Sequence, residues 1–235
     1  VDVDQSKNIL VQQFVQEVMT QVEPRAVVFT SLWDYLVSPS YYFQVVEKER
    51  PDVIFIDREL LQNRTWYFIQ MGRRYPEVDS LSKKSIDAFL IELNKFEKGE
   101  PFNYLTIKNR WDELLSDMIT RLTQSHPVYV DPRIADEFPP EYDRVPEGLL
   151  VRLVKRGEKA EWKPIIVKFE GGSFANYVTE DMRRYYASMY TYHSMYLLEQ
   201  KRLGEGLQSL QEALTVDPSF IPALNLKSRL STLVR

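Results

Sequence analysis

Three short apolar segments, each rich in β-branched residues, constrain the fold of this chain more than any other feature. They occupy residues 26–30 ("AVVFT"), 53–56 ("VIFI") and 127–130 ("PVYV"). Each is too short for a typical helix and has the composition of a buried strand. A helical pattern separates the first two segments, and a β-α-β unit of about 30 residues makes its strands parallel through a right-handed crossover. We therefore predict that the three segments are neighbouring parallel strands of one sheet, with helices on both faces.

Amphipathic patterns fill the chain between these segments. Apolar residues recur at helical spacing over residues 5–22, which predicts a first helix there. A second helix is expected over residues 31–44 and restarts at Pro39, because proline fits the first turn of a helix. Three further helices are predicted, the first with Trp66, Ile69 and Met71 and the other two from apolar stripes at residues 86–96 and 111–122.

The second half of this region has a different composition. Residues 132–147 are rich in prolines and acids and are expected to form a surface loop. The segments 148–154 and 163–169 are apolar and predict a β-hairpin that closes the sheet, and residues 170–176 ("EGGSFAN") are typical of a flexible hinge. The prediction for residues 1–176 is therefore an α/β domain, a Rossmann-like parallel sheet with flanking helices and a closing hairpin.

Residues 177–235 are expected to be helical, with breaks near 201–204 and 217–218. Within this region, residues 206–224 resemble the second half of a tetratricopeptide repeat. The resemblance rests on Leu210 at the large apolar position, Ala213 at the small one and Pro218 five residues later. It implies one short tetratricopeptide-like hairpin followed by a capping helix.

The resemblance to the repeat has departures, because Ser194 stands where the family has Gly and Gly206 where it has Ala. A free-standing solenoid needs at least about three repeats. We therefore expect the helical segment to pack as a lid or buttress against the α/β domain, and the alternative is a peptide-binding groove.

Charge and composition restrict the possible partners. The 34 acidic and 30 basic residues are interspersed and give a formal net charge of −4, which disfavours a nucleic-acid partner. The chain has no cysteine, which excludes disulfides, thiol catalysis and Cys-ligated metals. Its apolar runs are far shorter than the roughly 20 residues of a membrane helix, so we expect it not to insert into a membrane. Because the first residue is Val rather than Met, we expect a fragment or a processed product.

Sequence motifs for catalysis are missing. The chain has no Gly-x-Gly-x-x-Gly after a strand, no Walker A loop and no Gly-x-Ser-x-Gly elbow. His126 and His193 are the only histidines, and we expect His193 to be a packing residue on an aromatic helix. The sequence therefore predicts no catalytic residue, no metal site and no cofactor.

Polar residues nevertheless follow the predicted strands. Ligands of open parallel sheets bind beyond the carboxyl ends of the strands. In this chain, the residues at those ends are Ser31, Asp34, Asp57, Arg58, Glu59, Asp131 and Arg133, and the candidates for ligand binding among them are Ser31, Asp34, Asp57, Arg58 and Asp131. They would either bind a ligand or cap the helices that follow, and capping by the three aspartates is the favoured alternative.

The stretch "SLWDYLVSPSYYFQ" (residues 31–44) concentrates aromatic side chains after the first strand. Trp33, Tyr42 and Phe43 would either pack between helix and sheet or form a platform on which a sugar ring stacks. Packing is the favoured alternative, and Trp33 and Tyr42 remain candidate ligand-binding residues. The residues that we expect to be mostly buried are Trp33, Phe55, Trp66, Phe89 and Trp111.

A string of motifs in residues 26–67 carries a family resemblance. It includes the Trp33-Asp34 pair, "R-P-D-V" at residues 50–53 and "L-L…W-Y" ending at Tyr67. This order resembles the C-terminal soluble region of a bacterial multi-span membrane protein family that is related to protein O-mannosyltransferases. The resemblance covers residues 5–154. It implies a domain on the extracytoplasmic (periplasmic) face of a bacterial inner membrane, tethered through a preceding membrane region that holds the catalytic acid.

Two functions follow from these observations. In the first, the chain is a non-catalytic accessory domain of a membrane-embedded glycosyltransferase-like protein and positions an acceptor or partner. Its partners would be the membrane-spanning part of the same polypeptide and a protein or glycan acceptor. In the second, it is an independent α/β enzyme or sugar- or nucleotide-binding module with its ligand at the strand ends. Capped, filled strand ends would favour the first function, and a polar pocket there would favour the second.

Overall fold

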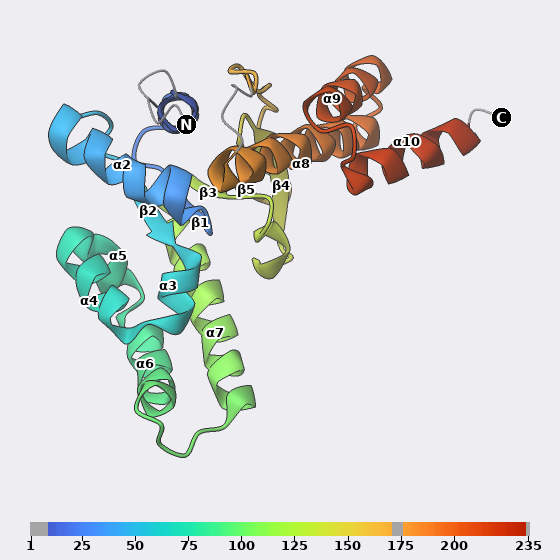
Figure 1. Ribbon diagram of the computed structural model, residues 1–235. Coiled ribbons are helices and arrows are strands. Elements are labelled where there is room, and N and C mark those ends of the chain that lie inside the picture. Colours follow the sequence, from blue (N-terminus) through green and yellow to red (C-terminus); the bar gives the residue numbers. More distant parts are fainter. Residues whose placement is uncertain (1–8, 171–175, 234–235) are drawn as a thin grey trace.

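The structure is a computed structural model and describes residues 9–170 and 176–233 (Figure 1). Its strands are β1 (Val27–Thr30), β2 (Ile54–Asp57), β3 (Val128–Val130), β4 (Tyr142–Glu147) and β5 (Leu150–Lys155). Its helices before β3 are α1 (Leu10–Gln21), η1 (Trp33–Val37), α2 (Ser38–Tyr42), η2 (Phe43–Glu47), α3 (Arg58–Asn63), α4 (Thr65–Arg74), α5 (Pro76–Leu81), α6 (Lys83–Glu97) and α7 (Tyr104–Leu122). The helices after β3 are η3 (Ala135–Glu137), α8 (Tyr177–Glu199), α9 (Leu203–Val216) and α10 (Ile221–Leu233).

The five strands form one mixed sheet in the order β2-β1-β3-β5-β4. β1 pairs in parallel with both β2 and β3, and Val27 lies opposite Ile54 on one side and Val128 on the other. This confirms the prediction of three parallel neighbouring strands. All residues of these strands are buried, which explains their continuous apolar composition, because helices cover both faces of a parallel sheet.

The connections place the helices on opposite faces. The chain moves from β1 to β2 in one direction across the sheet and from β2 to β3 in the other. Right-handed crossovers therefore put η1–α2–η2 on one face and α3–α7 on the other. In Figure 1, α3–α7 lie below the sheet, and α1, α2 and α8 lie above it.

The hairpin differs from its prediction. It consists of β4 and β5 joined at Gly148, whose φ of +60° favours glycine. Residues 142–147 are thus a strand rather than a loop, and 163–169 is not a strand beyond one bridge from Lys163 to Glu147. The physical reason is that β4 is an edge strand, where proline and charged side chains are tolerated.

The segment after the hairpin crosses α1. The carboxylate of Glu17 on α1 accepts hydrogen bonds from the backbone of Ile166 (2.9 Å) and Val167 (3.1 Å). These bonds satisfy backbone groups that a strand would have paired. The predicted hinge at 170–176 lies almost entirely outside the described residues, as do residues 5–8 of the first predicted helix.

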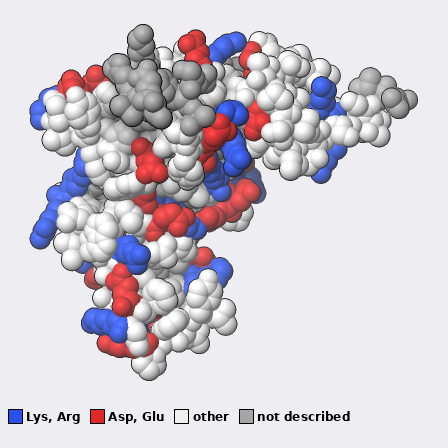
Figure 2. All heavy atoms as spheres, in the orientation of Figure 1, with Lys and Arg blue, Asp and Glu red and all other residues white. Residues whose placement is uncertain are grey.

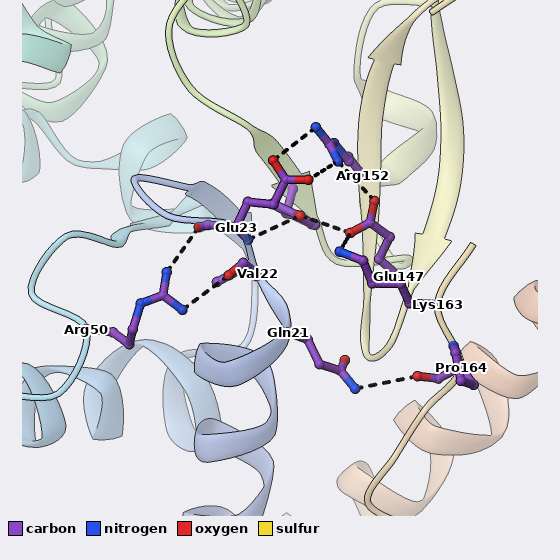
Figure 3. A network of polar contacts seen from close by, with 9 residues as sticks. Gln21, Val22, Glu23, Arg50, Glu147, Arg152, Lys163 and Pro164 are labelled. Atoms are coloured by element: carbon purple, nitrogen blue, oxygen red, sulfur yellow. Dashed lines mark hydrogen bonds and ion pairs between the residues drawn. The ribbon is translucent and has the colours of Figure 1, made fainter. Parts of the chain in front are cut away.

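A charged network links the residues that follow α1 to the β4–β5 hairpin and to Lys163 (Figure 3). The buried carboxylate of Glu147 accepts from Lys163 Nζ (2.6 Å), Tyr129 Oη (3.0 Å) and Arg152 Nη1 (3.3 Å), and Arg152 also pairs with Glu23. Beside it, Arg50 donates to Val22 O (3.1 Å) and other carbonyls at the end of α1. The arginine thus satisfies carbonyls that the helix itself leaves unpaired.

The helical run of residues 33–47 corrects two predictions about aromatic residues. Its buried side carries Tyr35, Leu36 and Phe43, whereas Trp33 is 41% exposed and Tyr42 is 52% exposed. Trp33 and Tyr42 face away because side chains that share a helix face recur every three or four residues. Pro39 lies in the first turn of α2, as predicted, and the helical run continues through it.

The remaining core predictions divide in the same way. Phe55, Phe89 and Trp111 are buried, as predicted, and Phe89 packs against Trp111 with ring centroids 5.6 Å apart. Trp66 is 48% exposed, so its predicted burial is wrong. It lies at the start of α4, whose buried face is formed by Tyr67, Phe68 and Met71.

The C-terminal region forms three helices, with breaks where the sequence predicts them. α8 packs on the α/β body, because the ring of Phe14 on α1 contacts those of Tyr185 and Tyr186 at centroid distances of 5.3 and 5.9 Å. Tyr185 Oη also donates to Leu149 O at 2.6 Å. These contacts fit the buttress predicted from the sequence.

Candidate functional site

A buried carboxylate joins the carboxyl ends of β1 and β3. Asp131 is fully buried and accepts hydrogen bonds from Ser31 N (2.6 Å), Thr30 Oγ1 (2.9 Å), Arg133 N (2.9 Å) and Ser31 Oγ (3.2 Å). Burial raises the pKa of Asp131, and the bonds from Ser31 and Thr30 oppose this effect. All four donors belong to the protein, so this carboxylate has an internal structural role.

An ion pair lies beside this carboxylate. The guanidinium of Arg133 contacts the carboxylate of Asp181 on α8 at 3.0 and 3.1 Å, and Tyr35 Oη donates to the same carboxylate at 2.8 Å. The guanidinium also lies 5.3 Å from the ring centroid of Tyr185. The network therefore anchors α8 and η1 to the end of β3.

Asp57 at the end of β2 is a helix cap. Its carboxylate accepts from Leu60 N at 2.7 Å, and its own backbone N–H donates to Tyr67 Oη at 2.8 Å. Burial raises the pKa of Asp57, and the bond from Leu60 opposes this. Capping by Asp57 is thus confirmed. The prediction for Asp34 is wrong, because Asp34 is exposed and η1 has no side-chain capping bond.

An open groove of about 600 Å³ lies beyond the strand ends, between α3, α7 and residues 136–141. Arg58, Trp111, Lys108, Tyr104 and Glu137 are among its lining residues. Of the candidate residues named from the sequence, only Arg58 lines this groove; Ser31, Asp57 and Asp131 lie in the internal networks. An adjoining apolar pocket of about 170 Å³ shares Tyr104, Lys108 and Trp111 with it.

Electrostatically, the groove is mixed. Arg58 donates to Glu137 through Nε at 2.7 Å and pairs with Glu59 at 2.8 Å, and its guanidinium lies 5.8 Å from the ring centroid of Trp111. Lys108 pairs with the neighbouring Asp112. Figure 2 shows acidic and basic side chains interspersed over the face that it presents. The groove therefore offers paired charges and the aromatic side chains of Tyr104, Trp111 and Phe138 for recognition.

Sequence reasoning did not find the α7 side of this groove, although a signal for it exists. α7 has 19 residues and β3 only 3. At 1.5 Å per helical residue against about 3.3 Å per strand residue, such a helix is nearly three times as long as its strand. The first half of α7 therefore has to project beyond the sheet, as Figure 1 shows.

Trp33 and Tyr42, the two aromatic candidates, lie apart from this groove. Tyr42 is exposed, and its hydroxyl donates to Glu47 Oε1 at 2.6 Å. Trp33 lines a separate hollow of about 300 Å³ together with Trp66 and residues of α4. The structure thus distributes the candidate residues over two internal networks, a groove, a hollow and the exposed surface.

The histidines have structural surroundings. His193 is buried and accepts from Trp162 Nε1 at 2.6 Å, while its Nε2 lies 2.8 Å from Gly148 O. Burial lowers the pKa of His193 to about 4. The prediction that His193 is a packing residue is confirmed. Within residues 9–170 and 176–233, no cluster of three or more His, Asp or Glu side chains is arranged to hold a metal ion.

Comparison with protein-family models, with curated proteins and with solved structures gives no match for this chain. Among the helices in the described part of the chain, none combines the length and apolarity that crossing a membrane requires.

Proposed function

We propose that this chain is a non-catalytic accessory domain of a membrane-embedded glycosyltransferase-like protein and that it positions an acceptor or partner. The proposal places the chain on the extracytoplasmic (periplasmic) face of a bacterial inner membrane. The observation that carries it is the state of the strand ends. Asp131 and Asp57 are buried and hydrogen-bonded within the protein, whereas catalysis needs a tuned, accessible acid or base in a cleft. The motif string at residues 26–67 supports the membrane-protein context.

The finer fold belongs to the same proposal. A Rossmann-like arrangement is supported by β2-β1-β3, whose parallel strands reverse their order at β1. A tetratricopeptide-like tail is supported by the α8–α9 hairpin, in which Leu210 and Ala213 are buried. In this proposal, α8–α10 form a buttress, and the open groove is the surface left for recognition.

The first experiment tests the absence of chemistry. The purified chain, incubated with lipid-linked and nucleotide sugars, is expected to give no glycosyl transfer and no hydrolysis above background. Turnover that disappears in Asp57→Asn would overturn the proposal and make the strand-end carboxylates an active site. Asp34→Asn is tested in the same way, because Asp34 is exposed. Turnover that disappears in this variant would also overturn the proposal.

A second experiment tests recognition through the groove. Lys108 and Arg110 lie on the same helix, and each is exposed and forms one ion pair, but only Lys108 lines the groove. In a membrane protein that carries this domain, Lys108→Glu is expected to reduce cross-linking to the acceptor or to the membrane-spanning part. Arg110→Glu, with the same change of charge, is the matched control. Equal effects of the two substitutions would argue against the groove.

One observation favours the alternative function, an independent sugar- or nucleotide-binding module. The groove lies where open parallel sheets bind ligands, and Arg58 and Trp111 line it. In that case, the isolated chain would bind a nucleotide sugar in calorimetry, and Arg58→Ala would abolish the binding. A chain that binds acceptor but no nucleotide sugar supports the accessory function.

A further inference from the structure

The hollow of about 300 Å³ that Trp33 lines lies between the helical run 33–47 and α4, away from the groove. Trp33 and Trp66 line it, and these residues are 41% and 48% exposed. Each ring meets a tyrosine edge to face: Trp33 contacts Tyr41 at 6.3 Å, and Trp66 contacts Tyr67 at 5.9 Å between centroids. Tyr67 is itself buried and held by the backbone of Asp57. The tryptophan rings are therefore positioned by the protein in the absence of a ligand.

The same hollow carries positive charge. Arg73 and Arg74, in the last turn of α4, both line it, and neither forms an ion pair with a described residue. Arg74 stacks over the ring of Tyr41 at 3.8 Å and donates to Gln44 Oε1 at 2.7 Å. A cation at the end of a helix also complements the helix dipole, but this effect leaves the guanidinium donors available. The two arginines can therefore receive an anion.

Two further polar groups lie at the wall. Gln70 supplies an amide, which both donates and accepts hydrogen bonds. The buried hydroxyl of Tyr75 lies near the backbone of Phe55 and beside Arg74, but it makes no hydrogen bond of ordinary length and angle among the described residues. This hydroxyl is enclosed by the protein, so of these two polar side chains at the wall Gln70 is the one offered to a ligand.

We propose that this hollow binds a single pyranose ring that carries an anionic substituent, a phosphate or a carboxylate. The apolar face of a pyranose packs on an aromatic ring, and its hydroxyls need a group such as the Gln70 amide, which both donates and accepts hydrogen bonds. Guanidinium groups pair with phosphate and carboxylate through parallel hydrogen bonds. The volume of about 300 Å³ lies at the lower end of the range of ligand pockets and suits one ring.

This inference rests on the hollow alone and is independent of the proposed accessory function. A single hollow also differs from the extended track of aromatic and basic residues that binds single-stranded nucleic acid. A mononucleotide is the competing occupant, because a base stacks on tryptophan as well. The experiment has to separate these ligands.

Isothermal titration calorimetry with the whole chain tests the proposal. The probes are glucose 1-phosphate, glucuronate, glucose, inorganic phosphate and adenosine monophosphate. Glucose 1-phosphate and glucuronate are expected to bind with 1:1 stoichiometry and at least about tenfold more tightly than glucose or phosphate, because ring and anion are recognised together. Tighter binding of adenosine monophosphate would overturn the sugar assignment, as would absence of binding by both anionic sugars at millimolar concentration.

Two substitutions locate the binding. Trp66→Ala and Arg73→Gln change exposed residues of the hollow and are each expected to weaken the binding of glucose 1-phosphate about tenfold. Arg73→Gln is expected to leave the weak binding of neutral glucose unchanged. Arg64→Gln, an exposed arginine outside the hollow, is the control and retains full affinity. Unchanged affinity in both hollow variants, with circular dichroism like that of the parent, would overturn the proposal.

Discussion

Two buried ionisable residues have opposite effects on the stability of this protein. Burial raises the pKa of Glu17 to about 7, and burial lowers the pKa of His193 to about 4. A histidine in the unfolded chain has a pKa of about 6.5. When the pH falls below this value, the unfolded chain binds a proton at His193 that the folded state does not bind, because the side chain is buried. Its stabilising contribution is therefore present above pH 6.5 and is lost as the pH falls towards 4. Glu17 has the opposite effect on stability. Between pH 4.5 and 7 the folded state binds its proton more tightly than the unfolded chain does, so the free energy of unfolding rises as the pH falls.

We predict that the two effects nearly cancel between pH 7 and pH 5. In Glu17→Gln only the histidine effect remains, so acidification over this interval should lower the free energy of unfolding by about 2 kcal/mol. In His193→Gln, the same acidification should raise it by a similar amount. Urea denaturation at the two pH values measures both changes. Equal pH dependence in the parent and both variants would show that neither residue titrates as its burial requires.

At the candidate site, the sequence identified positions better than roles. Ser31, Asp57 and Asp131 do lie at the strand ends, because the apolar pattern fixes where each strand stops. The role of Asp131 depends on donors that the fold brings from a distant part of the chain, such as Ser31. The donor to Asp57 is the nearby Leu60, so its capping role was predictable from the sequence. The predicted burial of Trp33 and Trp66 is wrong. It could not be avoided from one sequence, because the sequence does not reveal which face of a short helix is covered.

Among the elements, the parallel strands were predictable and the hairpin was not. The strands β1, β2 and β3 are buried on both faces, so their composition alone identifies them. β4 contains Pro146 and three charged residues, a composition typical of a loop. Only its position at the edge of the sheet, a property of the tertiary structure, makes it a strand.

The contact between α8 and α9 gives a prediction at the same scale. A Cβ atom added at Gly206 would lie 2.8 Å from Leu198 Cγ and 3.3 Å from the backbone oxygen of Ser194. Gly206→Val should therefore lower the free energy of unfolding by about 1–3 kcal/mol, the usual cost of overpacking. Gly204→Val is the matched control, because it lies on the same helix with no neighbour within 4 Å. If thermal melts show equal effects, the two helices are less closely packed than the structure indicates.

At the scale of the whole molecule, the C-terminal helices share their core with the sheet. Met182, Tyr185, Tyr186 and Met189 of α8 are buried in one hydrophobic cluster with residues of α1 and of the strands. A sequence boundary at 176/177 was predicted from composition, with an α/β domain before it and the helical segment after it. The extent of this shared core leads us to expect that the two parts unfold together.

We therefore predict that the chain unfolds in one cooperative transition and that residues 1–176 alone show no cooperative melt. Without α8, the rings of Phe14 and Tyr35 lose their contact with Tyr185. The apolar area that this exposes costs roughly 25 cal/mol of stability per Å². We expect these losses to outweigh the net stability of about 5–15 kcal/mol that typically separates folded from unfolded domains. Truncation after residue 216, which removes α10, is the matched control. It should keep the cooperative melt, because most side chains of α10 are exposed. Differential scanning calorimetry compares the three chains, and a cooperative transition of residues 1–176 near the parent midpoint would mean that the two parts fold independently.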